Sequence, residues 1–125
     1  VAAPNEAGVI DNLLRETSAS VKAFTDLSLP EVTALLSRSM LFVGNDSGIA
    51  HIAAAVRTPS VVIFGSSNVA HWRPWAAAAA EVVREELACQ PCAGYSCGEF
   101  ETPECIRRVP VERVTAAVGR VLEED

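Results

Sequence analysis

The alternation of apolar and polar stretches predicts a β-α-β unit in the middle of the chain. Residues 41–43 and 61–64 are continuous apolar runs, a pattern typical of strands in a parallel sheet that is covered on both faces. Residues 44–60 between them are enough for a helical crossover, whereas a hairpin would need only a few residues. We therefore expect an α/β fold with two buried, parallel strands joined by a short helix.

Apolar residues at helical spacing predict further elements on either side of this unit. Asn5 is a candidate N-cap for the first helix. The second helix follows Ser28, which has Glu31 three positions later as in a capping box, and Pro110 opens the last helix. The predicted ranges are 6–16, 29–39 and 111–122 for the helices and 21–24 for a short strand.

The turn from Gly44 to Gly48 is the first place to look for chemistry, because open α/β sheets bind ligands at the carboxyl ends of their strands. Asp46 or Ser47 can serve as the N-cap of the following helix, and Gly48 leaves the first helical amides open to an anion. His51 then lies about one turn into the helix. The pattern indicates a phosphate site. The competing interpretation is an ordinary strand-to-helix turn with a packed or surface histidine.

Two later segments could contribute to the same region. Residues 65–68 follow the second strand, so they lie beside the Asp46 turn if the two strands are neighbours, and they would then line the same cleft. Residues 71–75 carry two tryptophans and a base, which can cover a nucleotide or close the core beneath a loop. We favour the packing role for these aromatic side chains.

Length and charge narrow the class of protein. At 125 residues, half of them apolar, the chain can build one core without metals or disulfides, so one domain is expected. A formal charge of −6 with scattered Lys and Arg argues against a nucleic-acid partner. No apolar run has the length of a transmembrane segment, and the start lacks the pattern of a signal peptide. We expect a cytoplasmic protein.

Four cysteines form a cluster with C-x2-C-x4-C-x7-C spacing, a density typical of metal sites. A C-x2-C pair is the usual first half of a zinc or iron–sulfur site, but the second half departs from the paired pattern. Free thiols, or pairs oxidised during purification such as Cys89 with Cys97 and Cys92 with Cys105, are the alternatives. The candidate ligands of a structural zinc are Cys89, Cys92, Cys97 and Cys105.

The string GNDSGIAHIAAAVRTPSVVIFG closely resembles the D-[ST]-G-x-x-H segment of glycosyltransferase family 9, the heptosyltransferases of lipopolysaccharide assembly. The resemblance extends through SLPEVTALLSRSMLFV upstream and through the cysteine cluster downstream, so it covers nearly the whole chain. It implies a Rossmann-like parallel sheet flanked by helices. Residues 1–125 would be most of the nucleotide-sugar half of a two-domain GT-B enzyme, without the N-terminal acceptor domain, with a variable loop over 76–80 and a short strand near 81–84.

The resemblance also implies roles for individual residues. Glu6 would contact the ribose of the donor, although an acidic residue in a first helical turn is favoured by the helix dipole in any protein. Leu27 would contact the adenine ring, with packing under its own helix as the competing interpretation. The donor's phosphates and sugar would be held by Asp46, Ser47, Gly48 and His51. The catalytic base of such enzymes belongs to the absent domain, so none is assigned here.

The function implied is transfer of heptose from ADP-heptose to the inner core of lipopolysaccharide, with inversion and without a required metal. The acceptor, a lipid-linked saccharide, would be bound mainly by the missing domain, so this chain alone is expected to be inactive. The protein would be cytoplasmic or held peripherally at the inner membrane. The alternatives are a non-catalytic nucleotide-binding module and a sugar-nucleotide epimerase of the same fold.

Overall fold

The structure is a computed structural model that describes residues 1–75, 78–92 and 96–123. Contacts between residues group the chain into two compact units, Val1–Leu35 and Leu36–Asp125. Each unit is described by itself.

The first unit contains the short 3-10 helix η1 (Pro4–Glu6) followed by α1 (Ala7–Glu16), so the helix predicted over 6–16 is confirmed. The predicted N-cap is wrong, because Asn5 lies inside η1. Glu6 instead provides a side-chain hydrogen bond at the start of η1, since its Oε2 accepts the backbone N–H of Ala3 at 2.7 Å.

Helix α2 (Leu29–Leu36) begins with the predicted capping pair and ends three residues earlier than expected. The backbone N–H of Ser28 donates to Glu31 Oε2 at 2.8 Å, and the Ser28 hydroxyl donates to the same oxygen at 2.5 Å. These bonds stabilise the charged carboxylate and lower the pKa of Glu31. The short strand predicted over 21–24 is wrong: that segment has no regular structure. Among the described residues, its one backbone hydrogen bond to a distant segment runs from Ala2 N–H to Phe24 O. A single bond does not make a strand pair.

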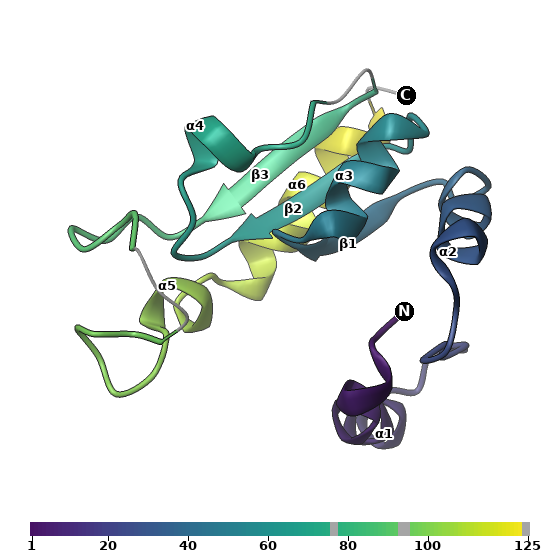
Figure 1. Ribbon diagram of the computed structural model, residues 1–125, viewed down its shortest axis with the longest axis horizontal. Helices are drawn as coiled ribbons and strands as arrows, with labels where there is room; N and C mark the ends of the chain where they lie inside the picture. Colours follow the sequence, from purple (N-terminus) through teal and green to yellow (C-terminus); the bar gives the residue numbers. More distant parts are fainter. Residues whose placement is uncertain (76–77, 93–95, 124–125) are drawn as a thin grey trace. The chain divides into compact units, whose positions relative to one another are not determined.

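The second unit is built on a three-stranded parallel sheet in the order β1-β2-β3 (Figure 1). The strands are β1 (Phe42–Asn45), β2 (Ser60–Phe64) and β3 (Ala80–Arg84). Both pairings of β2 are parallel, with Val43 opposite Val61 and Val61 opposite Glu81, so all three strands run in the same direction. The predicted parallel β-α-β unit is confirmed, and so is the short strand expected near residues 81–84.

Helices cover both faces of this sheet, as Figure 1 shows. Val61 faces α6 (Val111–Glu123), where it packs with Val83, Ala117 and Val121. The next residue, Val62, faces α3 (Gly48–Ala55) on the opposite side and packs with Ala50 and Phe64. Successive side chains of β2 therefore pack into two separate cores on opposite faces of the sheet. This is why the sequence of β2 is a continuous apolar run.

Two predictions about burial are wrong. Strand β1 is not buried on both faces: it lies at the edge of the described sheet, and Val43 is 45% exposed. The tryptophans near α4 (Val69–Trp72) do not close the core either, since Trp72 is 58% and Trp75 96% exposed. Helix α4 is only one turn long and contacts the core through Val69, whereas Trp72 stays exposed.

Candidate functional site

A cavity of about 240 Å³ lies at the carboxyl ends of β1 and β2. Its polar wall comes from the ends of these two strands, and its apolar wall comes mainly from Ile63, Phe100 and Ile106. The polar residues of this wall are Asn45, Asp46, Ser66 and Ser67, and Ser96 also lines the cavity. The loop after β2 therefore shares a cavity with the Asp46 turn, as predicted from the parallel arrangement of the strands.

Asp46 is held at this edge by the sheet itself. Its backbone N–H donates to Ile63 O at 3.0 Å, which extends the β1–β2 ladder by one residue. Among the described residues that line the cavity, Asp46 is the only one with a charged side chain. A half-buried carboxylate in largely apolar surroundings needs hydrogen-bond donors, so this wall is suited to a ligand that carries hydroxyl groups.

The start of α3 is open to a ligand. Ser47 has the extended backbone of an N-cap, with φ −161° and ψ 168°, but its side chain makes no capping bond. A Cβ atom at Gly48 would meet nothing within 4 Å, so the space beside the first helical turn is free. His51 is exposed, and the buried face of α3 is made by Ala50, Ala53 and Ala54. An anion could therefore approach these amides, as the sequence indicated.

The cysteine segment belongs to the same cavity, which the sequence did not reveal. All four cysteines line it, and the backbone N–H of Cys92 donates to Ser66 O at 3.0 Å. Burial raises the pKa of the Cys92 thiol, and the neighbouring Cys89 thiol adds to this shift. Gly65 is the one residue in the sequence that marks this close approach: a Cβ atom there would lie 2.8 Å from Ile106 Cγ1. Only glycine lets α5 (Glu104–Arg107), which carries Cys105, lie so close to the end of β2.

The family model of glycosyltransferase family 9 (heptosyltransferase) matches residues 2–101. The chain belongs to this family. It is similar to lipopolysaccharide heptosyltransferase 3 of Escherichia coli, with 49% identity over 49 residues, which is 39% of this chain and 14% of that protein. It is also similar to lipooligosaccharide heptosyltransferase 2 of Campylobacter jejuni, with 31% identity over 83 residues, 66% of this chain and 26% of that protein. No solved structure matches the chain significantly.

This family 9 chain thus spans a seventh to a quarter of the length of these relatives. Two of the residues that the resemblance assigned to the donor, Glu6 and Leu27, lie in the first unit. Glu6 already caps the chain start, and Leu27 is half-buried. Their contacts with ribose and adenine stay predictions.

The four thiols of this family 9 chain are free in the structure. Within residues 1–75, 78–92 and 96–123, which include all four cysteines, no three His, Cys, Asp or Glu side chains are placed to hold a metal ion. Sharing a cavity is therefore not the same as converging on one point, and the zinc hypothesis gains no support from the arrangement of the sulfurs. None of the helices in the described part of the chain is long and apolar enough to cross a membrane.

Proposed function

We propose that this chain is the donor-binding part of an inverting heptosyltransferase that uses ADP-heptose and extends the inner core of lipopolysaccharide. The observation that carries the proposal is the position of Asp46, at the carboxyl end of β1 and beside the open first turn of α3. The family match covers this turn, and the relatives named above are heptosyltransferases of lipopolysaccharide and lipooligosaccharide.

The donor's diphosphate would lie at the first turn of α3. Inversion takes one displacement, in which the leaving diphosphate gains negative charge as the acceptor hydroxyl attacks. The amides after Ser47 and the imidazole of His51 would stabilise that charge, so the transfer would require no metal. Asp46 would accept hydrogen bonds from hydroxyl groups of the sugar. We assign no catalytic base to this chain.

The other partners follow from the same proposal. Glu6 and Leu27 would contact the adenosine part of the donor. The acceptor would be a lipid-linked saccharide bound mainly outside this chain, at the cytoplasmic side of the inner membrane. The competing functions are a non-catalytic nucleotide-binding module and a sugar-nucleotide epimerase.

The test is a pair of histidine variants in the full-length protein. His51→Ala should lower kcat/KM for ADP-heptose by roughly tenfold to a hundredfold, the loss expected for one charge-assisted contact with the transition state. The melting temperature should stay nearly unchanged, because His51 is exposed. The matched control is His71→Ala, at the other histidine of the chain, which is also exposed and does not line the cavity.

Equal losses in both histidine variants, or unfolding of His51→Ala, would contradict the assignment. Asp46→Asn provides a second comparison, because it removes the charge and keeps an amide of nearly the same size. Product analysis in the same assay separates the alternatives: an epimerised donor supports the epimerase, and donor binding without any product supports the binding module.

A further inference from the structure

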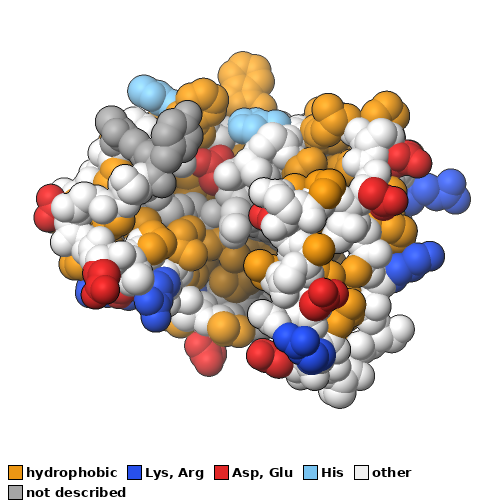
Figure 2. All heavy atoms as spheres, turned by 60° about the horizontal axis from the view of Figure 1, so that its bottom comes forward, with side chains coloured by type: hydrophobic (Ala, Val, Ile, Leu, Met, Phe, Trp, Pro, Cys, Tyr) orange, Lys and Arg blue, Asp and Glu red, His pale blue; other side chains and the backbone are white. Residues whose placement is uncertain are grey.

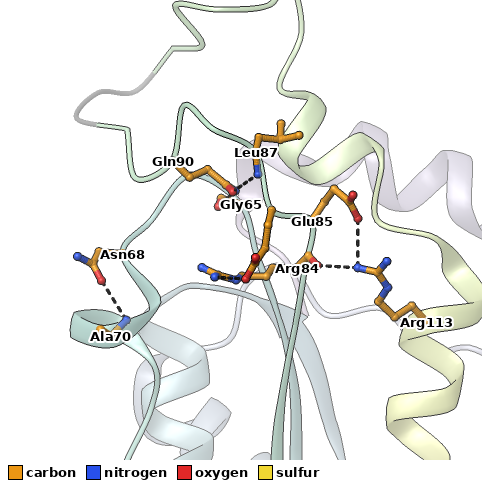
Figure 3. A network of polar contacts seen from close by, with 9 residues as sticks. Gly65, Asn68, Ala70, Arg84, Glu85, Leu87, Gln90 and Arg113 are labelled. Carbon is orange, nitrogen blue, oxygen red and sulfur yellow. Dashed lines mark hydrogen bonds and ion pairs between the residues drawn. The ribbon is translucent and has the colours of Figure 1, made fainter.

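A second hollow lies beside the cavity at Asp46, and Gln90 is one of its lining residues. The side-chain amide of Gln90 donates to Gly65 O at 2.7 Å, and its Oε1 accepts the backbone N–H of Leu87 at 2.8 Å (Figure 3). These bonds tie the loop after β2 to the loop after β3. Gln90 lines only the second hollow, whereas Ser67 and Leu87 line both. We call this second hollow, of about 750 Å³, the arginine groove.

The arginine groove has an excess of positive charge in a chain of net charge −6. Arg73 and Arg84 line it, and Glu86 is the one acidic residue among its described lining residues. The guanidinium of Arg84 forms an ion pair with Glu86, whose side chain is 75% exposed. Such exposed pairs contribute little stability, so the oxyanion of a ligand can replace the Glu86 carboxylate. Arg73 makes no ion pair within the described part of the chain.

We propose that the arginine groove binds a phosphate group carried by a saccharide ligand. Guanidinium groups match phosphate in charge and geometry, and two of them face one hollow here. Asn68 offers a further donor: its Oδ1 accepts the N–H of Ala70 at 3.0 Å, and its NH2 group points away from that bond (Figure 3). The size of the groove lies within the usual range for small-molecule sites.

The phosphate has two chemical sources. It is either part of the donor's diphosphate or a separate phosphate on the acceptor saccharide. Only the saccharide part of the proposal rests on the proposed function, because phosphate binding by Arg73 and Arg84 can be measured without any sugar transfer.

The experiment is a titration of the full-length protein with inorganic phosphate and with pyrophosphate at constant ionic strength, followed through the arginine Nε–Hε NMR signals. Arg73→Gln and Arg84→Gln should each weaken binding about tenfold or more, since each removes charge-assisted hydrogen bonds. Glu86→Gln should strengthen binding, because it frees Arg84 from its ion pair. Arg38→Gln, at an exposed arginine that does not line the groove, is the control and should leave the Kd unchanged.

A repeat of the titration with saturating ADP identifies the source. Loss of phosphate binding in the presence of ADP assigns the groove to the donor's diphosphate, in place of the first turn of α3, whereas unchanged binding assigns it to a separate phosphate. Both results support the groove as a phosphate site. No binding, or the same weakening in Arg38→Gln as in Arg73→Gln and Arg84→Gln, overturns it. If His51→Ala does not lower kcat/KM while Arg73→Gln and Arg84→Gln weaken phosphate binding, the proposed function is wrong and the phosphate site in the groove is supported.

Discussion

At the residue scale, single side chains at loop-to-element junctions determine how the chain enters its helices. Glu31 receives both the backbone N–H and the hydroxyl of Ser28, so one carboxylate fixes the start of α2. Ser47 has the backbone of an N-cap and makes no such bond, so the amides of α3 stay open. The contrast separates a helix start that is closed by its own side chains from one that is free to take a ligand.

The Glu31 carboxyl should titrate below the ordinary value of 4.5, because its pKa is lowered by the Ser28 hydroxyl first and the Ser28 amide second. A folded-state pKa below the unfolded one adds stability above the unfolded value, and this stability is lost as the pH falls through the folded pKa. Ser28→Ala removes the stronger of the two bonds, so the pKa of Glu31 should rise towards 4.5. An NMR pH titration of the Glu31 side chain checks this, and identical midpoints in both proteins would contradict it.

At the scale of elements, the close approach of α5 to the end of β2 gives the cavity its shape. Ile106 and Cys105 of α5 stand where a side chain at position 65 would lie, at 2.8 Å from Ile106 Cγ1 and 3.5 Å from Cys105 Sγ. The cysteine-bearing segment is attached at the same place, through the bond from Cys92 N–H to Ser66 O. Gly65 thus links the sheet to the apolar wall of the site.

Gly65→Ala should destabilise the chain by about 1 kcal/mol, the low end for overpacking because Ile106 is partly exposed and can shift. The measurement is urea or thermal unfolding. Gly48→Ala is the matched control, because a Cβ there meets nothing within 4 Å and its stability should be nearly unchanged. Equal stability of the two variants would show that α5 can move away from β2 at no cost.

These elements also show what the sequence can predict. The parallel pair β1 and β2 was predictable because two apolar runs and a crossover of sufficient length leave few other arrangements. The strand expected over 21–24 failed because strand formation needs a pairing partner, which composition does not show. That Asp46 and the cysteines line the same cavity was not predictable, because the spacing of residues in the sequence does not show where an irregular segment folds back. Gly65 was a signal that can be interpreted only once Ile106 is placed.

At the scale of the whole molecule, the acidic chain carries its positive charge in separate places. On the face drawn in Figure 2, Lys and Arg side chains stand apart among acidic and apolar ones, with no continuous basic surface. The arginine groove lies next to the cavity that holds Asp46, because Ser67 and Leu87 line both hollows. The two hollows together are suited to a ligand that combines hydroxyl groups with phosphate.

The last prediction concerns what this chain does by itself. Inverting transfer needs the donor, the acceptor hydroxyl and a base in one site, and the residues proposed here supply neither the base nor a site for the acceptor hydroxyl. The chain also spans only 14% of lipopolysaccharide heptosyltransferase 3 of Escherichia coli and 26% of lipooligosaccharide heptosyltransferase 2 of Campylobacter jejuni. We therefore expect the purified 125-residue chain to bind ADP weakly, measured by calorimetry, and to transfer no heptose. The full-length protein, assayed with the same donor and acceptor, is the positive control. Sugar transfer by the chain alone would mean that acceptor and base lie within these residues, and the division of roles proposed here would be wrong.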